Sequence, residues 1–198
     1  WYTEVPKDVM QGYTIMVDEA LKQMACKPTH VFLQGGVGGM AAAVASFILE
    51  TYGADSPIFV MIEPTNADCL LQSAKNGVPT VVHGDLETVM AGLSCGEISM
   101  LAWEILENKT SGFFSIPDEP IAEVMKYLAS LEEPVVAGES AVAGLAGYLI
   151  VQHSDEYRKA LEIDENSKIL FLGTEGDTDS LVYEKMVGKS SAEVLAKA

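Results

Sequence analysis

The stretch Gln34-Gly35-Gly36-Val37-Gly38-Gly39-Met40-Ala41 decides how this chain folds. It follows a short apolar run, residues 30–33, which is typical of a buried strand, and opens an alanine-rich run, residues 40–52, which is typical of a helix. Glycines at such a junction permit positive φ and let the backbone approach a ligand closely. Free N–H groups at the start of a helix bind anions, so residues 35–39 are predicted to hold a phosphate group.

Other interpretations of this stretch remain open from the sequence. It is not a Walker A loop, because no Gly-Lys-Ser/Thr follows. Gly36, Gly38 and Ala41 do match the dinucleotide pattern G-x-G-x-x-A, and Glu63 ends the next predicted strand, where an acidic residue would reach a ribose hydroxyl. Such a loop usually opens its fold, whereas here a long amphipathic helix precedes it. A tight turn packed against a neighbour is the third reading, which four glycines in five residues disfavour.

Working outward from this stretch, apolar strands alternate with helical segments. Further strands are predicted over residues 58–62, 80–82 and 169–172, and helices over residues 6–25, 67–76, 97–107, 121–131 and 141–152. Residues 113–116 are predicted to be extended or irregular, and a short helix and a polar tail from Gly188 to close the chain. Continuously apolar strands alternating with helices predict an α/β fold, a mostly parallel sheet with helices on both faces. Residues 1–198 form one domain in the simplest reading.

Composition narrows the class of protein. The 198 residues carry a net charge of −17 and a single arginine, which argues against binding to nucleic acid or anionic membranes. The longest apolar candidate, Ala141–Val151, is about half of the ~20 residues that span a bilayer. The start of the chain shows no secretory signal, and it lacks an initiator Met. Three sparse cysteines indicate free thiols in a reducing compartment, so the expected location is the cytoplasm.

Two further segments could carry chemistry. Residues 172–179 are polar and glycine-rich after the last strand, which suits either a ligand-binding loop or a solvated turn whose aspartate caps the next helix. Residues 138–141 miss the nucleophile-elbow pattern by one residue, and helix capping by Ser140 or Glu139 is the simpler interpretation. The three histidines are interpreted as structural or solvated, and no spacing of ligand residues predicts a metal site.

Several motifs together resemble a known enzyme family. They are the glycine stretch, Val60–Pro64, His83–Asp85, Ala91–Glu97, Gly138–Ala141 and Gly173–Gly176. This series resembles the tryptophan-synthase-β-like (fold type II) pyridoxal-phosphate enzymes. Within that family, Met10–Tyr13, Gly92–Glu97 and Thr174–Asp179 look like the diaminopropionate ammonia-lyases. The resemblance runs from about Trp1 to Gly188, and the glycine stretch is its least specific part.

The resemblance implies an activity, a cofactor and several site residues. The chain would be the C-terminal part of the cofactor-binding large domain, with the N-terminal half absent. The parent enzyme, a homodimer, would use pyridoxal 5′-phosphate to eliminate ammonia from 2,3-diaminopropionate, giving pyruvate and a second ammonia. Gly35, Gly36, Val37, Gly38 and Gly39 would hold the cofactor phosphate. Thr174 would hydrogen-bond the pyridine nitrogen, and Glu139 and Ser94 would line the face and edge of the ring. Sister families act on serine or threonine.

One departure from the family is large. None of the eleven lysines stands in the Ser-Phe-Lys-like context of the Schiff-base lysine. That lysine and the carboxylate base are therefore expected upstream of Trp1, and the chain alone is expected to be inactive. The non-enzymatic alternative is a truncated chain that folds and self-associates but binds nothing tightly.

Overall fold

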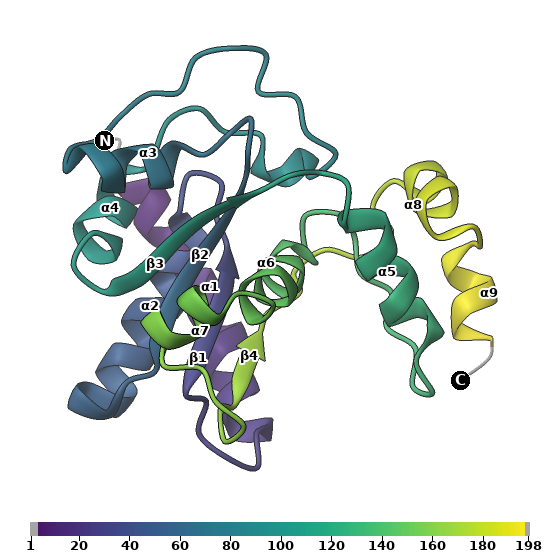
Figure 1. The fold of residues 1–198 in the computed structure, drawn as a ribbon, viewed down its shortest axis with the longest axis horizontal. Coiled ribbons are helices and arrows are strands. Elements are labelled where there is room, and N and C mark those ends of the chain that lie inside the picture. Colours follow the sequence, from purple (N-terminus) through teal and green to yellow (C-terminus); the bar gives the residue numbers. More distant parts are fainter. Residues whose placement is uncertain (1–3, 197–198) are drawn as a thin grey trace.

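A four-stranded sheet forms the centre of the molecule in the computed structural model, which describes residues 4–196 and so leaves Trp1 outside (Figure 1). The strands lie in the order β3-β2-β1-β4, and every neighbouring pair is parallel. Their bounds are β1 His30–Gln34, β2 Ile58–Pro64, β3 Thr110–Ile116 and β4 Ile169–Phe171. The predicted parallel α/β fold is confirmed.

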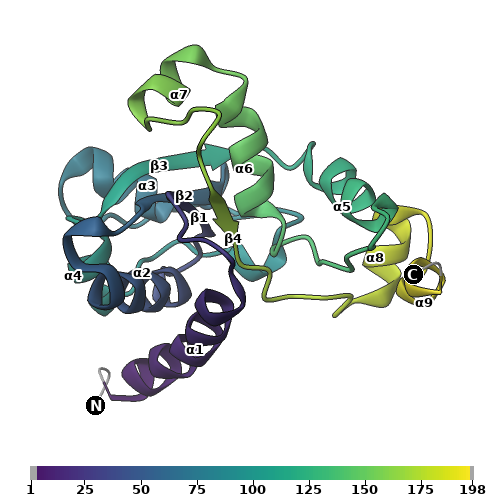
Figure 2. The same ribbon diagram turned by 90° about the horizontal axis from the view of Figure 1, so that it is seen from below.

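Helices and short 3-10 turns connect the strands. The bounds are α1 Glu4–Gln23, α2 Gly39–Tyr52, η1 Gly53–Asp55, α3 Cys69–Asn76, η2 Ala91–Leu93, α4 Met100–Leu106, α5 Ile121–Ser130, α6 Ala143–Gln152, α7 Asp155–Ala160, α8 Ser180–Val187 and α9 Ser191–Leu195. Figure 2 shows α1, α2 and α4 on one side of the sheet and α6 and α7 on the other. Within residues 4–196, no helix combines the length and the apolar character needed to span a membrane.

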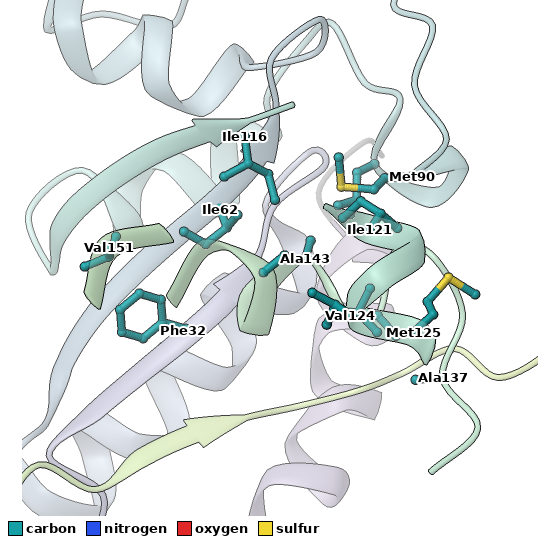
Figure 3. Close-up of a cluster of buried hydrophobic side chains, with 14 of the residues drawn as sticks. Phe32, Ile62, Met90, Ile116, Ile121, Val124, Met125, Ala137, Ala143 and Val151 are labelled. Atoms are coloured by element: carbon teal, nitrogen blue, oxygen red, sulfur yellow. The ribbon is translucent and has the colours of Figure 1, made fainter. Parts of the chain in front are cut away.

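Alternate strand residues feed two separate cores, one on each face of the sheet. Val31, Leu33 and Met61 point toward the α1–α2–α4 side. Phe32 and Ile62 point to the opposite side, where the core continues into α5 and α6 (Figure 3). The same core includes Tyr183 of α8. Because both faces are buried, the strands read as continuous apolar runs, which is why the sequence revealed them.

Helix α6 lies unusually close to the sheet. A Cβ atom at Gly144 would be 2.8 Å from the carbonyl oxygen of Phe32, and one at Gly147 would be 2.4 Å from Ile62 Cδ1. Glycine is therefore required at both positions for the backbone of α6 to reach the strands. This contact fixes where α6 begins, next to the carboxyl ends of β1 and β4.

Two of the predicted extended segments are corrected by the structure. Residues 80–82 form no strand, because Val81 is exposed and the Val82 N–H donates to Gly96 O instead of to a neighbouring strand. The sheet contains β3, Thr110–Ile116, in place of that segment. Of β3, only residues 113–116 were predicted to be extended or irregular. Ser111 and Gly112 interrupt the apolar pattern of this segment, so its local sequence has little strand propensity. Pairing with β2 stabilises the extended conformation instead.

The predicted helices are present with shifted ends. The helix expected over residues 97–107 begins at Met100, because the Ser99 side chain caps it by accepting the Ala102 N–H. Two short helices were missed. These are α7, capped by Ser154, and α9, whose Ser190 and Glu193 form a capping box within the polar tail.

Replacing Glu162 with glycine is expected to raise the free energy of unfolding by about 1 kcal/mol. Glu162 follows the end of α7 with φ of 56°, and the Ile163 N–H donates to Arg158 O at 2.8 Å, a helix-ending pattern that favours glycine. Urea unfolding of Glu162→Gly would measure the gain. Glu165→Gly removes the same charge from an exposed turn without positive φ and is the control. Equal effects in both variants would contradict the argument.

Candidate functional site

A cavity of about 330 Å³ opens where β1 and β4 end. Ligands in open α/β sheets bind outside the carboxyl ends of the strands, so this is the expected place for a site. Its walls come from α1, from the glycine stretch after β1, from the segment around η2, from the start of α6 and from the loop after β4. The lining residues are Val9, Tyr13, Gln34, Gly36, Val37, Gly38, Gly39, Met40, Ala41, Gly92, Leu93, Cys95, Ser140, Thr174 and Glu175.

The glycine loop has a backbone shape that only glycine tolerates well. Gly38 has φ of 90° and ψ of −2° and stands directly before α2. A Cβ atom there would lie 3.1 Å from Leu106 Cδ1 and 3.2 Å from Ala102 Cβ. A Cβ atom at Gly36 would lie 3.1 Å from the sulfur of Cys95. Positive φ and crowding together explain the glycines at positions 36 and 38.

Three amide groups of this loop are left without acceptors in the described part of the chain. In the described part of the chain, the N–H groups of Gly36, Gly38 and Gly39 donate to no protein atom. The carbonyl groups, by contrast, are occupied, since Gly36 O accepts from the Cys69 thiol and Val37 O accepts the Ser99 N–H at 2.8 Å. No acidic residue stands in the first turn of α2. The loop therefore offers donors and the positive end of a helix dipole, which suits a phosphate group.

Gly35 has a different task from its neighbours. Its N–H donates to Ile62 O at 2.8 Å and is not free for an anion. A Cβ atom at Gly35 would come within 2.7 Å of Leu70 Cδ1. This glycine thus allows close packing beneath the loop.

Two thiols flank the loop and are held protonated. Burial raises the pKa of Cys69 to about 12. Burial also raises the pKa of Cys95, against the lowering effect of the Val37 N–H that faces its sulfur. Thiolate is the nucleophilic form, so these cysteines pack as small side chains, as the sequence predicted.

Thr174 and Ser140 stand on the wall opposite the glycine loop. Thr174 is exposed to the cavity, and its hydroxyl has no hydrogen-bond partner among residues 4–196. Ser140 is buried, accepts the Gly92 N–H on its hydroxyl oxygen at 2.9 Å and donates its own N–H to Glu175. The predicted capping of α6 by Ser140 or Glu139 is therefore wrong, since no side chain caps that helix. Asp179 does cap α8, while Thr174 and Glu175 in the same loop line the cavity.

Besides Gly35, two predicted site residues lie outside the lining. The Ser94 hydroxyl donates to Leu86 O at 2.7 Å and is directed into its own segment. Glu139 is half-buried, and burial first, then the nearby charges of Glu175 and Asp179, raise its pKa. The structure brings the glycine loop and Thr174 to one cavity and sets Ser94 and Glu139 back from it.

Glu63 cannot act as the ribose-binding acid of a dinucleotide site. Its side chain is fully buried, and its two oxygens accept the backbone N–H groups of Leu70 and Leu71 at 2.8 and 2.7 Å. Both oxygens are thus spent at the start of α3. Burial raises the pKa of this carboxyl to about 8. The dinucleotide-binding interpretation is therefore wrong, because Glu63 has no oxygen left to accept a ribose hydroxyl.

His30 is held by hydrogen bonds within the protein, as expected for a structural histidine. The His30 ring is buried between Leu161 O, 2.7 Å from Nε2, and the Thr29 hydroxyl, 2.8 Å from Nδ1. Among the described residues, no group of histidine, cysteine or acidic side chains could hold a metal ion.

Sequence reasoning missed several lining residues. Gln34 directly precedes the glycines, is buried, and donates its side-chain amide to Leu172 O at 2.8 Å. A polar residue at the end of an apolar strand was a usable signal. Val9 and Tyr13 come from α1, and only the tertiary fold brings that helix to the cavity.

Comparison with known proteins agrees with this geometry. A family model described as "Pyridoxal-phosphate dependent enzyme" matches residues 3–175. Diaminopropionate ammonia-lyase of Escherichia coli (strain K12) is 38% identical over 196 residues, which cover 94% of this chain and 49% of that protein. A probable D-serine dehydratase of Vibrio cholerae serotype O1 is 27% identical, over 78% of this chain and 37% of its own length.

A solved structure shows the same fold. The holo form of diaminopropionate ammonia lyase from Escherichia coli superposes with a TM-score of 0.85 and 35% sequence identity, covering 93% of this chain and 48% of that chain. The chain thus spans about half the length of the curated relatives it matches. The family resemblance predicted from the motifs is confirmed. Because the family model matches residues 3–175, most of its length, the chain belongs to the pyridoxal-phosphate-dependent enzyme family.

Proposed function

We propose that this chain is the cofactor-holding portion of an ammonia-lyase that acts on 2,3-diaminopropionate and releases pyruvate and ammonia. The observation that carries the proposal is the glycine loop, whose Gly36, Gly38 and Gly39 N–H groups have no protein acceptor in the described chain and stand before α2. The similarity to diaminopropionate ammonia-lyases over nearly the whole chain supports the substrate.

The residues at the cavity fit pyridoxal phosphate. The glycine loop would hold its phosphate, and the Thr174 hydroxyl, which lacks a partner among residues 4–196, would bond its pyridine nitrogen. When bound, pyridoxal phosphate supplies an electron sink that makes the substrate Cα–H acidic. A hydroxyl is too weak an acid to keep the ring nitrogen protonated, which suits elimination. Roles for Ser94 and Glu139 at the ring stay predictions.

The lysine that bonds the cofactor would come from a different segment of a longer protein. No lysine is among the residues that line the cavity. This chain leaves about half of the length of its relatives unmatched. On this proposal, the lysine and the base belong to that unmatched part. On this proposal the chain alone is inactive. Pairing of two parent molecules and a cytoplasmic location also stay predictions.

The test measures 2-oxo acid release by the longer protein that contains this chain. With 2,3-diaminopropionate, kcat/KM is expected to exceed that with serine or threonine by at least about tenfold, because a site built for an amino group leaves polar groups unpaired with a hydroxyl. This 198-residue chain is the control and is expected to release none. Preference for serine or threonine would support the sister activity, towards which the 27% identity to a D-serine dehydratase points less strongly. Release from no substrate would overturn the proposal.

A further inference from the structure

Two walls of the cavity are irregular segments that the sheet does not hold directly. Gly92 and Cys95 belong to the long stretch between α3 and α4, where the single regular turn is η2. Thr174 and Glu175 lie in the loop between β4 and α8. Something other than strand pairing must set the distance of these walls from the glycine loop.

A chain of hydrogen bonds joins the two irregular walls. Glu175 Oε2 accepts the Ser140 N–H at 2.8 Å, and Ser140 Oγ accepts the Gly92 N–H at 2.9 Å. In addition, the Glu175 carbonyl accepts the Gly138 N–H at 3.0 Å. Glu175 and Ser140, which we call the wall bridge, thus connect the Thr174 loop through the turn before α6 to Gly92.

The neighbouring glycines make room for the wall bridge. A Cβ atom at Gly138 would lie 2.5 Å from Glu175 Cγ, and one at Gly92 would lie 2.9 Å from Ser140 Oγ. The backbone is therefore shaped around these two side chains, and a change at Glu175 is transmitted to both walls.

We infer that Glu175 is a positioning residue that, through Ser140 and Gly92, holds Thr174 at the separation from the glycine loop that a ring carrying a phosphate group needs. This inference rests on the proposed function. Its anchor is the approach of α6 to the sheet, since α6 is fixed on β1 and β2 by Gly144 and Gly147. The glycine loop does not depend on Glu175, because Ser99 and Cys69 hold its carbonyl groups.

Two ligands separate the two functions of the cavity. Inorganic phosphate occupies the glycine loop alone, whereas pyridoxal phosphate needs the loop and the opposite wall. Glu175→Ala is expected to weaken pyridoxal phosphate binding to the chain by at least about tenfold, because Thr174 is no longer held at the separation that the ring needs, with phosphate affinity unchanged. Glu175→Gln keeps an oxygen that can accept the Ser140 N–H and is expected to restore binding. Glu184→Ala, an exposed change of equal charge on α8, is the control.

Titration calorimetry and the absorption spectrum of bound pyridoxal phosphate give the affinities, and hydrogen exchange of the Gly92 amide reports on the bridge without any ligand. Faster exchange in Glu175→Ala than in wild type and Glu175→Gln is expected. Equal pyridoxal phosphate affinity in all variants, or unchanged Gly92 exchange, would overturn the inference. A wild-type chain that binds neither phosphate nor pyridoxal phosphate would instead overturn the proposed function, and the exchange of Gly92 would still decide the bridge.

Discussion

As the pH rises from 5 to 9, the free energy of unfolding is expected to fall by roughly 4 kcal/mol through one carboxyl group, Glu63. Burial raises the pKa of Glu63 to about 8, against the lowering effect of the Leu70 and Leu71 N–H groups, from an ordinary value of 4.5. Nearby Asp68 raises it further, and the Cys69 thiol lowers it slightly. The unfolded chain ionises this group near 4.5, whereas the folded chain keeps it neutral up to about 8. The stabilisation is complete below 4.5 and is lost as the pH rises through 8.

Glu63→Gln tests this because glutamine cannot ionise and has nearly the same size; its amide nitrogen cannot accept one of the Leu70 and Leu71 N–H groups, so the variant is less stable at every pH and the comparison is one of slopes. Urea unfolding of wild type at a series of pH values should show the decline, and Glu63→Gln should remove most of it. Glu139 adds a smaller decline of the same sign, since burial raises its pKa as well. Glu184→Gln on the exposed face of α8 is the control and should keep the wild-type slope. A slope that survives in Glu63→Gln would show that the buried carboxyl is not the source.

Gly38→Ala is expected to lower the affinity for pyridoxal phosphate between about tenfold and a hundredfold and to destabilise the fold by roughly 1–3 kcal/mol. The φ of 90° at position 38 strains any residue with a Cβ atom. The added methyl group would also press on Leu106, Ala102 and Leu70 at 3.1, 3.2 and 3.3 Å. Relieving that contact moves the Gly38 and Gly39 N–H groups away from a common anion.

Gly188→Ala is the matched control for this variant. Gly188 ends α8 with φ of 82° and ψ of 10°, close to Gly38, and a Cβ atom there would meet nothing within 4 Å. It is therefore expected to lose about 1 kcal/mol of stability from backbone strain alone, with unchanged affinity. Calorimetric titration with pyridoxal phosphate and urea unfolding measure both effects. Wild-type affinity in Gly38→Ala would place the phosphate elsewhere.

The sequence predicted well what local chemistry determines. Buried strands read as apolar runs, and the glycine stretch correctly predicted a strand–helix turn, in which Gly38 has positive φ. Prediction failed where tertiary contacts override local preference. Val81 and Val82 have strand-forming side chains but no partner strand, while Thr110–Ile116 looks irregular and pairs with β2 over most of its length.

The far wall of the cavity was only partly predictable for the same reason. Thr174 and the glycine loop were identified from motifs, yet nothing local in the sequence joins Glu175 to Ser140, 35 residues away. Glu63 shows the opposite error. Its position at the end of a strand suggested a ligand contact, and only the packing of α3 reveals that its oxygens are already used.

The proposed anion site has no basic side chain in its lining, and it belongs to a chain with a net charge of −17. Attraction is therefore confined to the last few ångströms, where N–H groups and the end of α2 act, while at longer range the protein repels a doubly charged phosphate ester. The association rate with the ligand is therefore expected to be low at low ionic strength. It should rise with added salt, because the screening length of the repulsion shortens to about 8 Å at physiological ionic strength. Once bound, the phosphate is held by neutral groups, so its rate of escape depends little on salt.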